Sequence, residues 1–171
     1  MGVLTQRVHD KLNASQWTLL RDLFVRVSEV ILGISPDSQG ELTGNYVKFA
    51  TGSDPMSPVY SVVWPKMSEP RRLIVGLTLP EDFQAESLGP PPEPIFYRGL
   101  TKFVVIEEGQ AIPEELTGWV KRAYEQTLFS EECCGCYWLC GIRRFPSVPP
   151  GRLQISGKDF GEESGAVCDE G

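Results

Sequence analysis

The strongest indication of the fold is the segment "PVYSVVWPKMSEPRRLIVGLTLP", residues 58–80. It contains two runs, residues 58–64 and residues 71–80, in which apolar side chains occupy every second position. A period of two residues is typical of a β-strand with one buried face. The expected apolar faces consist of Tyr60, Val62 and Trp64 in the first run and of Leu73, Val75, Leu77 and Leu79 in the second. The link "PKMSEP" is short and carries two prolines, so the two runs are predicted to pair antiparallel.

Two further strands and two helices are predicted around this pair. Residues 45–50 ("NYVKFA") and 100–108 ("LTKFVVIEE") are rich in residues that favour strands. Residues 14–34 place apolar side chains at helical spacing, and a second helix is predicted to begin at Pro113 and to end near residue 128. Each helix has one apolar stripe, which it can bury against the apolar face of a sheet. The predicted fold class is therefore α+β: a four-stranded, mainly antiparallel sheet with an N-terminal and a C-terminal helix packed on one face.

Length and composition predict one domain with an extension at each end. The chain has 171 residues, of which 41% are hydrophobic, and this is enough for a single core, expected within residues 14–128. Residues 1–13 form a polar N-terminal lead, and residues 129–171 form a cysteine-containing tail that is expected to be largely disordered. No apolar run approaches the roughly 18–20 residues that span a bilayer. The start lacks the apolar segment of a secretory signal, so we expect a cytoplasmic protein with no membrane partner.

Motifs of catalysis are scarce. The single histidine, His9, lies in the polar lead, and the sequence has neither a phosphate-binding glycine loop nor a nucleophile elbow. Acidic pairs such as Glu107–Glu108 are explained by solubility and strand geometry. We therefore expect no enzymatic activity and no cofactor. The formal net charge of −7 argues against a general attraction to nucleic-acid phosphates, although it leaves room for a local basic patch.

Basic and aromatic residues on and beside the predicted strands are the binding candidates. They are Tyr46, Lys48, Trp64, Arg71, Arg72, Arg98 and Lys102. If helices cover one face of the sheet, several of these side chains lie on its open face or rim, where they suit a peptide, a small anion or single-stranded nucleic acid. In the alternative interpretation, Trp64 and Tyr46 are core residues and the basic side chains balance surface acids.

Four of the five cysteines are clustered, at Cys133, Cys134, Cys136 and Cys140. A structural zinc site usually brings together two separated ligand pairs, and here the second pair is missing. A redox site at such spacing normally begins a helix of a thioredoxin-like fold, and acylation needs a membrane context. We expect no specific chemistry from the cluster, with zinc binding as the alternative.

Residues 24–128 resemble a small bacterial domain family of unknown function. The similar pieces are "LFVRVSEVILGISPD", "YVKFA", "YSVVWPKMSEPRRLIVGLTLP" and "FYRGLTKFVVIEEGQAIPEELTGWVKRAYEQT". Members of this family, sometimes labelled predicted transport proteins, occur alone or at the C-terminal end of larger proteins, some of them linked to restriction or DNA modification. The family is distantly similar to the YjbR-like double-wing proteins, for which DNA binding has been proposed. The resemblance implies an α+β domain with an accessory or recognition role, and it supplies no catalytic residues.

The sequence thus favours a non-enzymatic module that binds a protein or peptide partner through the open face or an edge of its sheet. The alternative is a nucleic-acid-binding accessory domain in a restriction or DNA-modification context.

Overall fold

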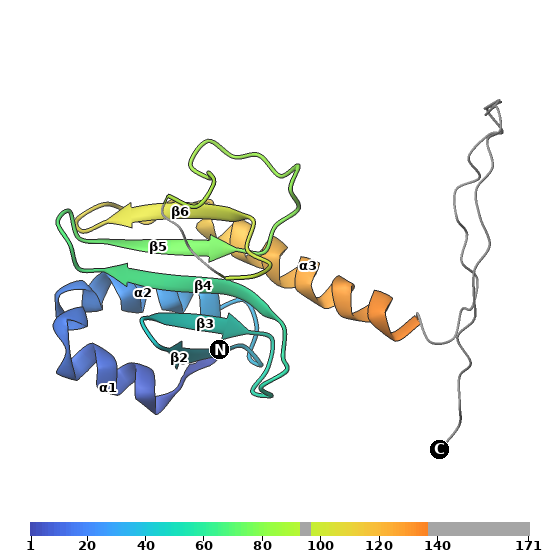
Figure 1. The fold of residues 1–171 in the computed structure, drawn as a ribbon, viewed down its shortest axis with the longest axis horizontal. Coiled ribbons are helices and arrows are strands. Elements are labelled where there is room, and N and C mark those ends of the chain that lie inside the picture. Colours follow the sequence, from blue (N-terminus) through green and yellow to red (C-terminus); the bar gives the residue numbers. More distant parts are fainter. Residues whose placement is uncertain (93–96, 137–171) are drawn as a thin grey trace, which may run out of the picture. The chain divides into compact units, whose positions relative to one another are not determined.

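The computed structural model describes residues 1–92 and 97–136, with the side chains of the last helix described as far as Phe129. Its elements in chain order are β1 (Val3–Leu4), α1 (Gln6–Ala14), the 3-10 helix η1 (Gln16–Leu20), α2 (Arg21–Leu32), β2 (Gln39–Thr43), β3 (Tyr46–Ala50), β4 (Val59–Lys66), β5 (Arg72–Leu77), β6 (Lys102–Glu107) and α3 (Leu116–Cys136). The strands form one sheet in the order in which they occur in the chain (Figure 1). Strands β1 and β2 are parallel, and every other neighbouring pair is antiparallel. The α+β class is confirmed, but the sheet has six strands where four were predicted.

The quoted stretch 58–80 forms the centre of the sheet as an antiparallel pair, β4 and β5, in which Val63 lies opposite Val75. One detail of its predicted alternation is wrong. The register between β3 and β4 shifts by one residue at Tyr60, because Phe49 pairs with Ser61 and Ala50 with Val59. This β-bulge turns Tyr60 toward the helices, whereas Val62 and Trp64 lie on the other side of the sheet.

Helices α2 and α3 cover one face of the sheet, here called the helix face (Figure 1). The core between the two layers includes Phe24, Val27 and Ile31 from α2, Leu116 and Val120 from α3, and Leu73, Val75 and Leu77 from β5. The helix predicted over residues 14–34 begins as η1 and continues as α2. Ser15 accepts a hydrogen bond from the Trp17 amide at 3.2 Å and so caps η1.

Both ends of the described chain correct the predicted boundaries. Residues 1–13 are not a solvated lead, because they form β1 and most of α1, and Val8 in α1 is 0% exposed. Val8 and Leu12 lie one helical turn apart and extend the core. At the other end α3 continues to Cys136, so residues 129–136 of the predicted tail are helical and carry three of the clustered cysteines. Residues 137–171, including Cys140, lie outside the described residues, as does the disorder predicted for them.

None of the described helices is long and apolar enough to cross a membrane.

Candidate binding site

The face of the sheet opposite the helices, here called the outer face, is partly covered by the segment between β5 and β6. Its buried centre consists of Val62, Trp64, Ile74 and Phe103, against which Tyr46, Val59, Tyr97 and Leu100 pack. The ring of Tyr46 lies 5.3 Å from that of Trp64 and 5.8 Å from that of Tyr97. This face is therefore a second small core over much of its centre rather than an open surface.

Gly76 makes this covering possible. It lies in β5 between Val62 of β4 and Phe103 of β6 on the outer face, and a Cβ at this position would meet the Leu100 Cδ1 at 2.7 Å and the Phe103 ring at 2.8 Å. The absent side chain leaves the space that Leu100 fills.

The structure brings together three of the seven predicted binding residues on the outer face, two of them in this small core. Trp64 is only 9% exposed, and Tyr46 is half-buried beside it. Lys48 lies on the same face and forms an ion pair with Glu41 at 2.8 Å. The hydrogen bond to Glu41 raises the pKa of Lys48, while partial burial acts in the opposite direction. Burial likewise raises the pKa of Tyr97, which lies over Tyr46.

The other four predicted residues do not converge. Arg71 bonds to Glu108 at 2.6 Å and to Glu69 at 3.3 Å, and the hydrogen bond to Glu108 raises the pKa of the guanidinium. Arg72 and Lys102 are half-buried and stand at opposite ends of the β5–β6 ladder. Arg98 is exposed in the loop before β6. Two of the predicted basic residues, Lys48 and Arg71, thus have carboxylate partners within the chain.

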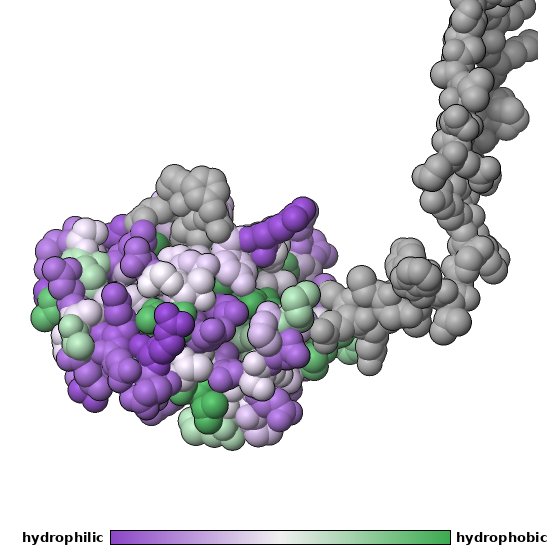
Figure 2. Space-filling view, turned by 60° about the horizontal axis from the view of Figure 1, so that its bottom comes forward, coloured by the Kyte–Doolittle hydropathy of each residue, from purple (hydrophilic) through white to green (hydrophobic). Residues whose placement is uncertain are grey.

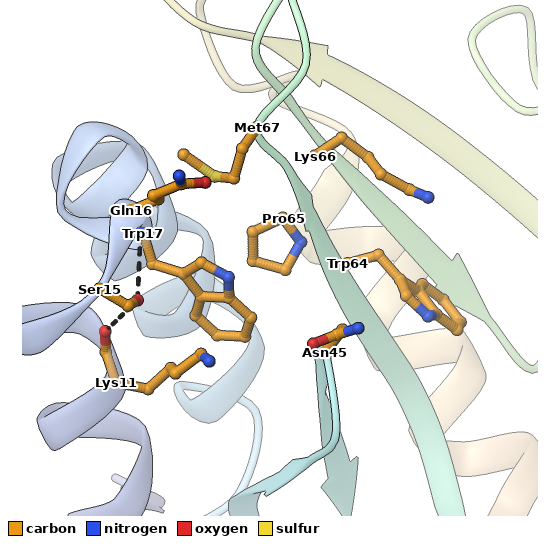
Figure 3. A pocket seen from close by; sticks show the side chains of 9 residues that line it. All are labelled: Lys11, Ser15, Gln16, Trp17, Asn45, Trp64, Pro65, Lys66 and Met67. Carbon is orange, nitrogen blue, oxygen red and sulfur yellow. Dashed lines mark hydrogen bonds between the residues drawn. The ribbon is translucent and has the colours of Figure 1, made fainter.

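A cleft of about 460 Å³ lies where the sheet meets the corner between α1 and η1 (Figure 3). We call it the Trp17 cleft. It is lined by Lys11, Ser15, Gln16 and Trp17 from that corner, by Asn45 from the β2–β3 turn, and by residues 64–67 at the end of β4. Of the residues singled out from the sequence, only Trp64 lines it.

The cleft exists because β4 is longer than its neighbour β3. Val47 and Val63 form the last pair between the two strands at this end. Just before β3, Gly44 and Asn45 form the turn that connects it to β2. Beyond Val63, the end of β4 faces the α1–η1 corner instead of a strand (Figure 3).

Pro65 suits this position in the strand. The Glu108 amide donates to the Arg71 carbonyl, so Arg71 turns its backbone toward β6 and the next residue, Arg72, faces Lys66 of β4. Pro65 therefore turns its backbone away from β5 and toward the cleft. A proline there leaves no N–H without a partner, while its carbonyl oxygen is directed to the cleft.

Trp17 forms the wall opposite β4. It is 5% exposed, and its ring packs on Phe24 with the centroids 6.1 Å apart. The Nζ of Lys11 lies 5.7 Å from the centroid of the Trp17 ring, within the range of a cation–π interaction. The Ser15 hydroxyl donates to the Lys11 carbonyl at 2.6 Å and accepts from the Trp17 amide, which fixes the corner. In Figure 3 the Trp17 indole and the Pro65 ring lie next to each other, whereas the side chains of Trp64 and Lys66 point to the other side of β4.

The chemistry of the Trp17 cleft is that of binding. Its side chains offer aromatic and proline surface, one hydroxyl, two amides and the ammonium group of Lys11. Among the described residues, no group of three or more histidine, cysteine or acidic side chains is placed to hold a metal ion. The side chains of the cysteine cluster lie outside the described residues, so this statement does not extend to them.

The binding residues predicted from the sequence did not include Lys11, Ser15 or Trp17, because Lys11 was assigned to the polar lead and the other two to the start of a helix. One signal was present: a proline at position 65, directly after a strand-like run, is typical of a strand edge.

Comparisons of the chain with protein-family models, with curated proteins and with solved structures found no match in any of the three. The resemblance drawn from the sequence therefore stays a prediction, and functional inference rests on the geometry of the site.

Proposed function

We propose that the protein is a non-enzymatic interaction module that binds a segment of a protein or peptide partner in the Trp17 cleft. One observation carries the proposal: β4 extends past β3 and, together with Trp17 and Lys11, encloses about 460 Å³ beside a strand edge. Binding sites for small ligands and for anchoring side chains have volumes of this order.

The lining of the cleft favours a polypeptide. Trp17 and Pro65 offer a rigid apolar surface of the kind that anchors a side chain at an interface. The amides of Gln16 and Asn45 suit the N–H and C=O groups of a main chain. Figure 2 shows a face on which hydrophilic residues predominate and hydrophobic ones form small separate areas, so this face offers no broad apolar interface.

This proposal moves the binding surface from the outer face to an edge of the sheet. Trp64 is buried in the small core of the outer face, and Lys48 and Arg71 are paired with carboxylates. The same pairing weakens the case for nucleic acid, because phosphate binding needs several converging cations that lack acidic partners.

The test is selection of binding peptides from a displayed random library on the immobilised protein. Peptides that are enriched are synthesised, and their dissociation constants are measured on two variants. Gln16→Trp fills the cleft, whereas Gln84→Trp makes the same change at an exposed loop position outside the cleft. We expect Gln16→Trp to weaken binding by roughly tenfold or more, which corresponds to about 1.4 kcal/mol, and Gln84→Trp to leave it unchanged.

Failure to enrich any peptide, or equal affinity for the two variants, would overturn the proposal. A labelled DNA oligonucleotide, single- or double-stranded, that binds at low salt and is displaced by added salt would instead support the nucleic-acid alternative.

A further inference from the structure

The Trp17 cleft continues along α1. A second hollow, of about 400 Å³, is lined by Arg7, Asp10, Lys11, Ala14, Ser15 and Leu42. Both hollows have Lys11 and Ser15 in their lining, so they are neighbours at the last turn of α1. Together they form a groove, here called the α1 groove, that leads from Arg7 past Lys11 to Trp17 and Pro65.

Basic side chains predominate in the α1 groove although the chain as a whole is acidic. Arg7 and Lys11 line it against a single acid, Asp10, whereas the whole chain has a net charge of −7, and the Lys66 side chain points to the other side of β4. The Asp10 carboxylate already accepts a hydrogen bond from the Gln6 amide at 2.9 Å. Arg7 and Lys11 are four residues apart on one helix, so they lie on the same side of α1 about one turn apart.

Lys11 stands at the junction of the two hollows. Its stem is half-buried, and its ammonium group lies over the Trp17 ring. The groove thus offers two successive positive charges along one helix and an aromatic anchor at its end.

We infer that the α1 groove binds an extended acidic polypeptide segment, whose carboxylates meet Arg7 and Lys11 while a neighbouring side chain enters the Trp17 cleft. This inference rests on the proposed function and adds the chemical class of the ligand. A polypeptide is favoured over single-stranded nucleic acid because successive bases stack on several aromatic rings, and Trp17 is the one aromatic side chain among the lining residues that faces the groove.

The experiment measures fluorescence anisotropy of labelled probes on the full chain at low salt. The probes are a heptapeptide of alternating glutamate and threonine, the same peptide with glutamine in place of glutamate, and a heptathymidylate. Arg7→Glu reverses a charge inside the groove. Arg122→Glu makes the same change at an exposed position of α3 and serves as the matched control.

We expect the acidic peptide to bind at least roughly tenfold more tightly than the glutamine peptide, and to lose affinity as salt is added. Arg7→Glu should weaken its binding by about tenfold, whereas Arg122→Glu should change it by less than about twofold, because a distant exposed charge is screened.

Three results would overturn the inference. Equal effects of the two charge reversals would show a response to net charge alone. Equal affinity of the acidic and glutamine peptides, both abolished by Gln16→Trp, would remove the acidic class while the proposed function stands. Binding of heptathymidylate that depends on Arg7, without binding of the acidic peptide, would replace a polypeptide by nucleic acid.

Discussion

Tyr60 occupies the extra position of the β-bulge in β4 and carries its hydroxyl into the core of the helix face. The hydroxyl donates to the Ile31 carbonyl at 3.3 Å, and the ring meets that of Tyr124 edge-on at 5.3 Å. Burial raises the pKa of Tyr60 from 10.0 to about 12, although the nearby Ser38 hydroxyl acts in the opposite direction. The folded protein therefore holds the phenolic proton more tightly than the unfolded chain does.

The raised pKa of Tyr60 makes stability depend on alkaline pH. Its contribution is present in full below pH 10 and is lost as pH rises through about 12, because the unfolded chain releases the proton first. Urea unfolding at pH 8 and pH 11 should show that the wild-type protein loses about 1 kcal/mol more than Tyr60→Phe over this interval. A variant that loses as much as the wild type would show that Tyr60 does not carry this dependence.

Substitution of a buried residue usually lowers the free energy of unfolding, but substitution of Ser28 is expected to raise it. It is buried in α2, and its hydroxyl has no hydrogen-bond partner among the described residues. Ser28→Ala should raise the free energy of unfolding by about 0.5–1 kcal/mol, because it removes an unsatisfied hydroxyl and places a better helix former. Ser15→Ala is the matched control and should lower it by about 1 kcal/mol, because the Ser15 hydroxyl makes two hydrogen bonds at the cap of η1. Thermal unfolding that moves both variants in the same direction would contradict this account.

At this scale, the sequence predicted which residues are apolar and buried better than it predicted which way they point. Alternation correctly paired Val62 with Trp64, but it also placed Tyr60 on their face. A bulge moves a side chain to the other face without changing the pattern of residue types, so periodicity carries no signal of it. The interpretation of Trp64 as a core residue, which was one of the two left open, agrees with its burial.

Among the elements, β5 depends on the absence of a side chain at Gly76. Gly76→Ala would force its Cβ against Leu100 and Phe103, and should lower the free energy of unfolding by about 1–3 kcal/mol. Gly118→Ala makes the same change in α3 where nothing lies within 4 Å, and should raise it by about 0.5–1 kcal/mol.

A double variant distinguishes two possible causes of the destabilisation in Gly76→Ala, namely overpacking and the loss of backbone freedom. If the collision with Leu100 is the cause, Gly76→Ala combined with Leu100→Ala should be less destabilised than the sum of the two single variants. Strict additivity in urea unfolding would show that the outer face is not packed as described.

The strands β3 to β6 were all predicted, because each has a run of branched or aromatic residues. Strands β1 and β2 were missed for physical reasons. Strand β1 has two residues, and β2, with the sequence "QGELT", contains no aromatic residue and one apolar side chain. In the sheet, β2 pairs with β3 and β1 pairs with β2, and the close approach of β1 depends on Gly40, where a Cβ would meet Leu4 at 2.5 Å. Such tertiary dependence is not visible in local propensity.

For the molecule as a whole, the N-terminal segment is part of the core, and this distinguishes the structure from the predicted polar lead. Val8→Asp should lower the free energy of unfolding by roughly 3 kcal/mol or more, because it buries an unpaired charge at a position that is 0% exposed. His9→Asp, at the neighbouring exposed position, should change it by no more than about 0.5 kcal/mol. If urea unfolding showed equally small changes in the free energy of unfolding for both variants, residues 1–13 would behave as a solvated lead and not as part of the core.

The candidate site likewise depends on how the whole chain folds. It joins α1, the β2–β3 turn and the end of β4, which are far apart in the chain. The sequence contained each part, but only the length difference between β3 and β4 creates the space between them. The predicted binding set failed to identify the cleft because it selected basic and aromatic residues by type, and several of these are buried or paired within the fold.

The most direct test of the central claim is a titration followed by amide and indole NMR resonances. The isotope-labelled protein is titrated with the alternating glutamate–threonine heptapeptide at low salt. Binding in the α1 groove predicts that the largest shifts occur at the Trp17 indole N–H and at the amides of Lys11, Ser15, Asn45 and Met67. The amides of α3 should remain unchanged. Shifts centred instead on the outer face around Tyr46 and Tyr97, or no shifts at saturating peptide, would contradict the account.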